Sequence, residues 1–312
     1  MDKEAAHVKK QKITSKKVIL TSFLVDVLDV ILNLILALIS GSVVMLTEVL
    51  EGFSDLVSSA FLMIGFYRSM QGEDKTHPFG YGTEIYFWSL LSALVMFGLT
   101  STLAFYFGWN RFFNPQPIHS SGLALTVLII TTFTNLYAFL LSFLRLVKKR
   151  PLRHIFRIFF RSSLVETKTT FTLDLMGTAS AILGSISLGV YFFTGDGRFD
   201  GLGAMIIGVT LAILAFFLIM GIRELLIGKS AAPETEAKIK KAALEIKEVD
   251  GILDIKTMHI GTEKLLVNLF VHMESGLGTR ELERLIDKIE DRVRKEVPSA
   301  KYVQVELESV RE

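Results

Sequence analysis

Six long apolar stretches, separated by short polar segments, dominate the chain as far as Gly228. Each holds roughly the 20 apolar residues that an α-helix needs to cross the hydrocarbon core of a bilayer. The pattern therefore predicts an α-helical membrane domain with six transmembrane helices over residues 17–228, preceded by a basic cytoplasmic tail over residues 1–16. The predicted spans lie near residues 17–40, 42–67, 84–108, 122–145, 164–193 and 198–226.

After Gly228 the long apolar stretches give way to short amphipathic segments. Some carry apolar side chains at helical spacing, and others have the composition or the alternation of β-strands. The element order αββαβ predicts a compact α+β domain over residues 229–312, with two helices packed on three strands. The expected helices lie at 233–249 and 279–297, and the expected strands at 252–260, 264–274 and 301–310.

Lysine and arginine are distributed unevenly between the two sides of the predicted bundle. The chain up to Lys17 has six lysines, and the loop over residues 145–161 has seven basic residues, whereas the opposite side has only Arg111 and Arg198. Because basic loops stay on the cytoplasmic side, we expect both termini to be cytoplasmic. The basic loop also contains isoleucines and phenylalanines, so it either sets topology by charge alone or forms an interfacial helix on anionic lipid.

Composition narrows the chemistry of the chain. Half of its residues (50%) are hydrophobic and the mean hydropathy is +0.46, as expected of a membrane protein, while the net charge of +2 adds little. The absence of cysteine excludes disulfides, thiolate metal sites and cysteine nucleophiles, so any metal must be held by oxygen or imidazole nitrogen. The sequence contains no nucleophile–base set, phosphate-binding loop or nucleic-acid module. We therefore expect neither an enzyme nor a nucleic-acid-binding protein, and no resident cofactor.

Oxygen-bearing side chains form a stripe on three of the predicted spans. Glu48, Glu51 and Asp55 in the second span are spaced i, i+3 and i+7, which places them within an arc of roughly 60°. A charge at the bilayer centre is expensive, so such side chains need a partner or a function. The first span repeats the spacing with Asp26, Asp29 and Asn33, and the fifth has Glu166, Thr170 and Asp174 at i, i+4 and i+8.

Two interpretations of these carboxylates compete. Pairing with a neighbouring lysine, or contact with the membrane interface, would satisfy those near the cytoplasmic ends of their spans, Asp26 and Glu166. It would not satisfy Glu51, Asp55 and Asp174, which lie well inside their spans where basic residues are few. Because uncompensated charge is prohibitive there, these three must be protonated, bind cations, or alternate between the two states. Alternation is what a proton-coupled cation carrier requires.

Several motifs in the right order resemble the cation diffusion facilitator family over nearly the whole chain. "SGSVVMLTEVLEGFSD" (40–55) resembles the family's second span, in which a metal ligand precedes an aspartate by four residues. "HPFGYGTEIYFW" (77–88) and "FDGLGAMIIGVTLA" (199–212) resemble the starts of its third and sixth spans. "EIYFWSLLSALVMFG" and "RELLIGKSAAPE" are similar to the zinc-transporter-nine-like subgroup.

This resemblance implies six transmembrane helices, a cytoplasmic ferredoxin-like domain and a homodimer that exports a divalent metal ion in exchange for protons. Carried over by position, the metal site comprises Glu51 and Asp55 from the second helix and Thr170 and Asp174 from the fifth. The family's fifth helix has histidine where Thr170 stands, so the expected site is all oxygen. Zn²⁺ is the family default, but carboxylate and hydroxyl ligands suit harder ions, so Mn²⁺, Fe²⁺ and Mg²⁺ remain open.

Four further polar residues lie beside this predicted site. Glu48 and Glu166, which the family does not assign, are expected either to join the site or to carry protons. Asn33 matches a polar position of the family's first helix, and Asp29 lies one turn from it.

Two other places in the chain resemble metal sites of the family. Asp74 and His77 match a site in the second-to-third loop, but Tyr81 stands in place of its second histidine, so His77 is alternatively a hydrogen-bonding loop residue. His259 and His272 lie on neighbouring predicted strands, where they are either a metal site or ordinary surface and structural residues.

The function predicted from these features is divalent cation efflux by alternating access, with protons as the exchanged ion. A non-transporting metal sensor or scaffold derived from the same family is the alternative, and a channel is a third option. The expected location is the inner membrane of a bacterium or archaeon, with an organelle membrane as the alternative. The expected partners are the lipid bilayer, protons, divalent cations and a second copy of the chain.

Overall fold

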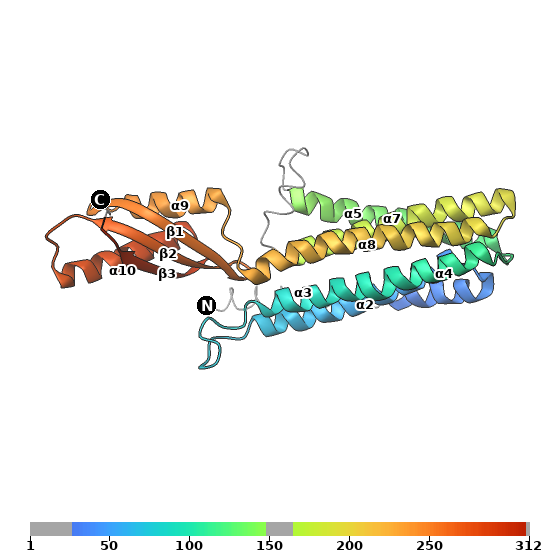
Figure 1. The fold of residues 1–312 in the computed structure, drawn as a ribbon, viewed down its shortest axis with the longest axis horizontal. Helices are drawn as coiled ribbons and strands as arrows, with labels where there is room; N and C mark the ends of the chain where they lie inside the picture. The colour runs from blue at the N-terminus through green and yellow to red at the C-terminus, as the bar shows by residue number, and fades with distance from the viewer. Residues whose placement is uncertain (1–26, 148–164, 310–312) are drawn as a thin grey trace, which may run out of the picture. The chain divides into compact units, whose positions relative to one another are not determined.

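The computed structural model describes residues 27–147 and 165–309 (Figure 1). These residues form two compact units: one holds most of the helical bundle, and the other holds the C-terminal domain with the α2–α3 loop and the adjoining helix ends. The helices before the C-terminal domain are Val27–Ser40, α2 (Val43–Ser69), α3 (Glu84–Val95), the π-helical turn η1 (Met96–Thr100), α4 (Ser101–Phe113), α5 (Ser121–Val147), α7 (Val165–Thr194) and α8 (Arg198–Ile227).

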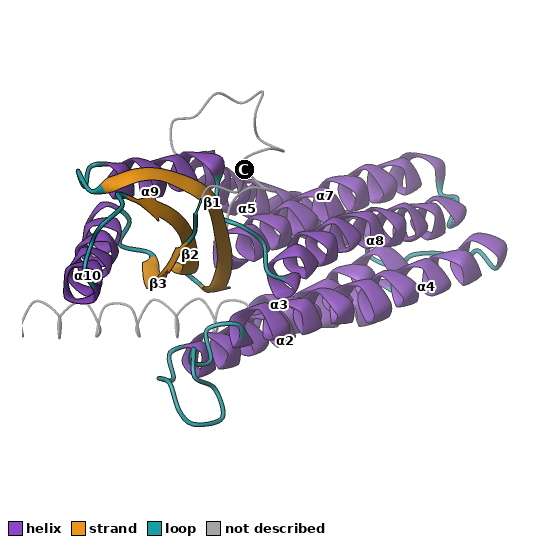
Figure 2. Ribbon diagram, turned by 60° about the vertical axis from the view of Figure 1, so that its left-hand side comes forward, coloured by secondary structure: helices purple, strands orange, loops and turns teal. Residues whose placement is uncertain are grey.

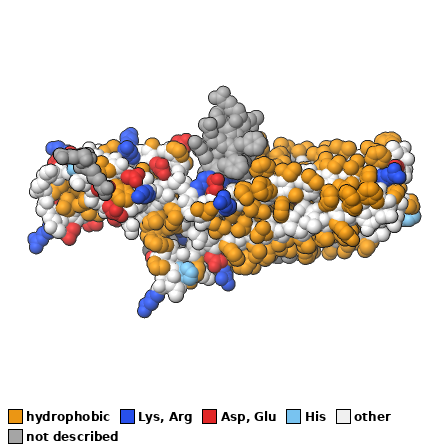
Figure 3. Space-filling view, viewed as in Figure 1, with side chains coloured by type: hydrophobic (Ala, Val, Ile, Leu, Met, Phe, Trp, Pro, Cys, Tyr) orange, Lys and Arg blue, Asp and Glu red, His pale blue; other side chains and the backbone are white. Residues whose placement is uncertain are grey.

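Five helices have the length and apolar composition needed to cross a membrane, with α3, η1 and α4 counted as one continuous helix over Glu84–Phe113. They correspond to the second to sixth predicted spans. Hydrophobic side chains cover the visible face of the bundle, as expected for helices that face lipid (Figure 3). Of the first predicted span the structure describes only the apolar helix Val27–Ser40, so Asp26 lies outside the described residues, as does most of the basic loop.

Small residues allow α4 and α8 to pack backbone against backbone. A Cβ on Gly108 would lie 2.7 Å from the carbonyl oxygen of Gly201, and a Cβ on Gly208 would lie 2.8 Å from that of Ser101. Because lipid supplies no hydrophobic driving force between helices, close van der Waals packing at small residues is a main source of their association.

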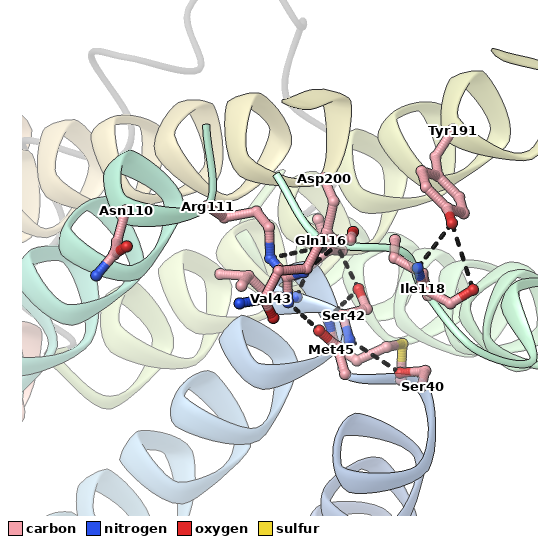
Figure 4. A network of polar contacts seen from close by, with 12 residues as sticks. Ser40, Ser42, Val43, Met45, Asn110, Arg111, Gln116, Ile118, Tyr191 and Asp200 are labelled. Atoms are coloured by element: carbon pink, nitrogen blue, oxygen red, sulfur yellow. Dashed lines mark hydrogen bonds and ion pairs between the residues drawn. The ribbon is translucent and has the colours of Figure 1, made fainter. Parts of the chain in front are cut away.

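A buried polar network joins four segments at the end of the bundle where α2 and α8 begin (Figure 4). Asp200, in the first turn of α8, accepts hydrogen bonds from Ser42 Oγ at 2.6 Å and from the backbone nitrogens of Val43 and Val44 at 2.8 and 3.0 Å. Arg111, at the end of α4, places Nε 3.6 Å from Asp200 Oδ2 and also donates to the carbonyl of Gly41. Asp200 therefore caps the free amides of α2 and offsets a buried guanidinium.

The third membrane helix is interrupted by the π-helical turn η1. The hydroxyls of Thr100 in this turn and Ser54 in α2 are hydrogen-bonded to each other. A π turn inserts one residue into a helix and is frequently found at functional sites. Here it lies against the segment of α2 that carries Glu51 and Asp55.

The C-terminal domain consists of α9 (Pro233–Leu244), β1 (Val249–Gly261), β2 (Lys264–Met273), α10 (Thr279–Glu296) and β3 (Ala300–Leu307) (Figure 2). The sheet order is β1-β2-β3, with β1 antiparallel and β3 parallel to β2. Alternate residues of β2 from Leu265 to Met273 face a core that also takes in Ile239 of α9 and Ile289 of α10. The αββαβ fold class predicted from the sequence is confirmed.

The α2–α3 loop packs on the C-terminal domain through two glycines. A Cβ on Gly82 would penetrate the carbonyl oxygen of Ile260, and a Cβ on Gly261 would lie 2.8 Å from Cα of Gly82. Beside this contact, Glu73 accepts hydrogen bonds from Lys301 Nζ at 2.7 Å and from the hydroxyl of Tyr302. The loop is thus joined to both edge strands of the sheet.

Replacing Gly82 with alanine is expected to separate this loop from the domain, because the new methyl group would meet rigid backbone rather than a movable side chain. We expect faster cleavage of the α2–α3 loop in limited proteolysis of the full chain and a loss of roughly 1–3 kcal/mol of stability. Gly72→Ala is the matched control, since a Cβ there meets nothing within 4 Å. Equal cleavage rates for the two variants would contradict the prediction.

Candidate cation site in the helical bundle

The predicted acidic stripe of α2 lies on a face that turns into the bundle. Glu48 and Glu51 are 5% and 3% exposed, and Ser54 and Ser58 farther along the same face are also buried. At about 100° per residue these side chains share one side of the helix. The face that carries carboxylates in the sequence is therefore an interior face of the bundle.

Glu48 meets α7 directly. Its Oε1 accepts a hydrogen bond of 2.6 Å from the hydroxyl of Ser180. This bond satisfies one oxygen of a carboxylate that the family resemblance leaves without a role. It also sets the register of two antiparallel helices, with Glu48 of α2 level with Ser180 of α7.

Glu51 lies one turn farther along α2, where the hydroxyl of Ser180 also interacts with its carboxylate. Within the described part of the chain, neither carboxylate oxygen has a partner at full hydrogen-bonding distance and angle. A Cβ placed on Gly177 of α7 would lie 4.0 Å from Glu51 Oε1 and 3.2 Å from Nδ2 of Asn135 in α5. Gly177 thus provides the space in which a buried carboxylate and an amide approach α7 together.

The remaining predicted ligands lie closer to the surface. Asp55 and Asp174 are half-buried, and Thr170 is exposed. Among the described residues no three carboxylate or imidazole side chains converge closely enough to hold a metal ion, so the predicted set is not assembled in this conformation.

The register of α2 and α7 nevertheless places these residues at one level. Glu48 lies beside Ser180 and Glu51 beside Gly177, so one further turn brings Asp55 level with Asp174.

The helix Val27–Ser40 adds a carboxylate, that of Asp29, to the three on α2. Asn33 is buried, and its Nδ2 donates a hydrogen bond of 3.1 Å to Asp29 Oδ2. Asp29 and Glu48 interact electrostatically, as do Glu48 with Glu51 and Glu51 with Asp55. The four side chains form a row in which neighbouring carboxylates repel each other when both are ionised, so a cation or protons would stabilise the row. Glu166 lies on α7, but its side chain is outside the described part of the structure.

Two residues near this row were not predicted from the sequence. For Asn135 the sequence does offer a signal, because it is a polar residue in the middle of the fourth apolar span. Ser180 carried no signal, because single serines are ordinary in membrane helices. Only the packing of α7 against α2 shows that its hydroxyl bonds a carboxylate.

The loop residues Asp74 and His77 form a turn of their own. Asp74 Oδ1 accepts bonds from the backbone nitrogens of Thr76 and His77 at 2.8 and 2.6 Å, and its Oδ2 accepts the hydroxyl of Tyr81 at 2.8 Å. The Thr76 hydroxyl also donates to Oδ1 at 2.7 Å, and this bond, followed by those from Tyr81 and the backbone, holds the pKa of Asp74 well below its usual range. The His77 ring lies on the Tyr81 ring with centroids 4.1 Å apart. The structure thus gives both residues local partners, in line with the loop-bonding alternative.

His259 and His272 do not come together within one chain. The antiparallel register pairs His259 with Leu265 and His272 with Gly251, at opposite ends of the ladder. Seven residues of β2 separate the two places, which corresponds to roughly 23 Å. The two histidines therefore lie too far apart to share a metal ion within one protomer, and metal binding by either of them stays a prediction.

His259 is 8% exposed, and burial together with the positive charges of Lys229 and Lys168 lowers its pKa to about 4. The unfolded chain binds a proton at this histidine near pH 6.5, whereas the folded chain does not until about pH 4. Stability is therefore expected to fall as the pH falls through this window, by about 1–2 kcal/mol for this group.

Thermal unfolding of the full chain in detergent between pH 7.5 and 4.5 tests this expectation. His259→Gln should lose less stability on acidification than the parent chain, because its side chain does not titrate. Acid titration of other groups is common to both proteins and cancels in the difference. A variant with the same pH dependence as the parent would show that His259 is not the group responsible.

Comparisons with known proteins agree with this architecture. Residues 19–227 match the family model of the cation efflux transmembrane domain, and residues 231–310 match that of the cytoplasmic domain of cation efflux proteins. Together they cover most of the chain and confirm the family and the fold class expected from its motifs. Among solved structures, the MamM C-terminal domain in a cadmium form aligns with 25% of this chain and 98% of its own at 11% identity, with a TM-score of 0.24.

Curated relatives share about a quarter of their aligned residues with this chain. The human mitochondrial proton-coupled zinc antiporter SLC30A9 is 25% identical over 268 residues, which are 85% of this chain and 47% of that protein. Metal tolerance protein C4 of Arabidopsis thaliana is 29% identical over 71% of this chain and 49% of its own length. The cation-efflux pump FieF of Shewanella oneidensis is 24% identical over 87% of this chain and 86% of its own length. The chain thus spans about half the length of the human and plant relatives.

Proposed function

Because this chain belongs to the cation efflux family, an integral membrane family, we propose that it exports a divalent metal cation from the cytoplasm in exchange for protons. The observation that carries the proposal is Glu51. It is a carboxylate 3% exposed, in the middle of a membrane-spanning helix, with neither oxygen at full hydrogen-bonding distance and angle from a partner among the described residues. Such a group is costly unless a cation or a proton neutralises it.

In the proposed cycle, Glu51, Asp55 and Asp174 bind the cation when they are ionised. Two or more negative charges offset the loss of the cation's hydration shell, and Thr170 supplies a hydroxyl at the cytoplasmic end of the same α7 face. Protons then bind the carboxylates on the opposite side of the membrane and release the cation. The neutral, protonated site returns across the barrier at little cost.

The ligands of this site are all oxygen, which bears on the identity of the ion. Zinc is the ion in the name of the human relative, and it accepts carboxylate ligands. Oxygen ligands also suit Mn²⁺, Mg²⁺ and Fe²⁺. A site that contained histidine would bind these three ions less well than it binds zinc. We propose zinc as the first ion to test and manganese as the second.

We further propose a homodimer in the inner membrane of a bacterium or archaeon with both termini in the cytoplasm. Residues 231–310 match a cytoplasmic domain of the family, and this supports a C-terminal domain on the cytoplasmic side of the membrane. FieF of Shewanella oneidensis aligns over 86% of its own length and is a bacterial protein, and this supports a bacterial membrane.

The proposal is tested by reconstituting the chain in vesicles with a metal-sensitive dye and a pH-sensitive dye. We expect uptake of Zn²⁺ or Mn²⁺ that an opposing proton gradient accelerates several-fold, with proton movement in the other direction. Metal flux that ignores the imposed gradient would refute coupling to protons. Absence of flux for every divalent ion, together with metal-dependent movement of the C-terminal domain, would favour a sensor over a transporter.

A further inference from the structure

Ser58 of α2, Ser92 of α3 and Thr169 of α7 are buried residues with hydroxyl groups that the proposed cycle does not use. Ser58 and Thr169 are fully buried and Ser92 is 1% exposed. None of the three hydroxyl oxygens has a hydrogen-bond partner in the part of the chain that the structure describes. A buried hydroxyl without a partner is costly, so each of them calls for a ligand that the neighbouring side chains do not supply.

Other hydroxyls of the bundle are satisfied by their own helix. A serine or threonine in a helix can donate to the backbone carbonyl three or four residues earlier. Thr132, Ser142 and Thr178 do so, at 2.8, 3.0 and 2.7 Å. The hydroxyls of Ser58, Ser92 and Thr169 do not make this bond, which leaves them available to a ligand between the helices.

Ser58 and Ser92 lie near one level of the bundle. Ser54 of α2 is hydrogen-bonded to Thr100 of α3, which fixes the register of these two antiparallel helices. Ser58 lies one turn beyond Ser54, and it shares its face of α2 with Glu51. Ser92 lies two turns before Thr100 on α3. The two serines are therefore separated by about one turn, or about 6 Å, along the bundle.

Thr169 reaches the same level from α7. Ser180 of α7 bonds Glu48 of α2, so these two residues are level. Eleven residues back from Ser180, or three helical turns, is Thr169, which thus lies on the face of α7 that meets α2. Ten residues forward from Glu48 is Ser58. The buried hydroxyls therefore lie between the carboxylates of α2 and the end of the bundle where α3 and α7 begin.

We propose that Ser58, Ser92 and Thr169 line a water-filled path from that end of the bundle toward Glu51, along which ions reach the carboxylates. Buried polar groups without protein partners are the places where internal water binds. Each hydroxyl can both donate and accept, so the three hold water without adding charge. Ser58 is seven residues, or about 10 Å, from Glu51 on one face of α2. That ions use the path rests on the proposed cation transport.

The chain contains no cysteine, so a single introduced thiol reports on its own position. Ser58→Cys, Ser92→Cys and Thr169→Cys are made in the full chain and reconstituted in vesicles. A cationic, membrane-impermeant methanethiosulfonate reagent is then added on the side of the C-terminal domain. A thiol in water ionises and reacts far more readily than one in apolar surroundings. We therefore expect each of the three to react at least about 10-fold faster than Ser142→Cys.

Ser142→Cys is the matched control, because Ser142 is 5% exposed and its hydroxyl is bonded to the carbonyl of Phe139. The bond of Asn135 to Gly177 sets the register of α5 and α7, and seven residues farther along α5 it places Ser142 within about one residue of the level of Thr169. Ser142 thus matches Thr169 in depth and burial but has a satisfied hydroxyl. Equal reaction rates in all four variants would overturn the proposal.

Removal of single hydroxyls tests whether ions use the path. Thr169→Val keeps the shape of the side chain, and Ser58→Ala removes the hydroxyl from α2. Each is expected to lower the flux of Zn²⁺ or Mn²⁺ by about 5-fold, as for the loss of one hydrogen bond, while Ser142→Ala retains parental flux. Parental flux in both variants would show that ions do not use the path. Should Thr169→Val fail to fold, Ser58→Ala and the thiol rates decide.

Failure of the underlying function gives a different result. A parent chain that moves neither ion, although the three cysteines react rapidly, would refute the proposed transport and support the water-filled path. A parent chain that transports while the three cysteines react as slowly as Ser142→Cys would refute only the path.

Discussion

Replacing Glu51 with glutamine is expected to lower cation flux in reconstituted vesicles by about 100-fold or more, while the protein remains folded. The carboxylate is buried, and no described residue is a partner at full hydrogen-bonding distance and angle, so its negative charge is available to offset the dehydration of a cation. Glutamine has nearly the same volume and polar atoms but no charge. The flux should therefore fall without a large change in helix packing.

The measurement is initial metal uptake at equal amounts of folded protein, with thermal unfolding in detergent as the check on structure. Glu283→Gln makes the same chemical change on the exposed face of α10 and should leave flux unchanged. Asp174→Ala is expected to resemble Glu51→Gln, because the register of α7 places Asp174 level with Asp55. Retention of parental flux in Glu51→Gln would remove this residue from the site.

Replacing Asp200 with alanine is expected to destabilise the protein by about 3–5 kcal/mol. Asp200 is fully buried, and its loss would leave the Ser42 hydroxyl, the first amides of α2 and the Arg111 guanidinium without their acceptor. For a protein of this size such a loss corresponds to a fall of about 5–15 °C in the unfolding temperature. Low yield of folded protein is the expected outcome at growth temperature.

Asp200→Asn should be milder, since one oxygen remains to accept from α2. Asp196→Asn is the control: Asp196 lies in the exposed turn before α8, where its Oδ1 accepts the Arg198 amide at 2.9 Å, and asparagine caps a helix about as well as aspartate. An Asp200→Ala protein as stable as Asp196→Asn would show that the network of Figure 4 contributes little to the fold.

The sequence predicted those features that depend on local pattern. Runs of apolar residues are long enough to specify membrane helices, and the period of the carboxylates on α2 was enough to place Glu48, Glu51 and Asp55 on one face. Its prediction of the αββαβ order was also correct, because strand alternation and helical spacing are readable over a few residues.

The partners of these residues could not be predicted, because they come from other helices. The bond of Ser180 to Glu48 and the bond of Asn135 to the backbone of Gly177 depend on how α2, α5 and α7 are rotated against one another. Nothing within a single helix specifies that rotation. The same holds for Asp200. From the sequence it is an ordinary first-turn residue of α8, but in the structure it caps α2, which lies more than 150 positions earlier in the chain.

The separation of His259 from His272 has the same origin. Both residues lie on neighbouring strands, as the sequence indicates, but the antiparallel register that places them at opposite ends of the ladder is a property of the pair of strands. The sequence by itself thus determined the family, the order and nature of the elements and the acidic face of α2. The tertiary structure alone decided which polar groups meet, because a hydrogen bond or a shared ion depends on a few ångströms of placement between elements that no local pattern encodes.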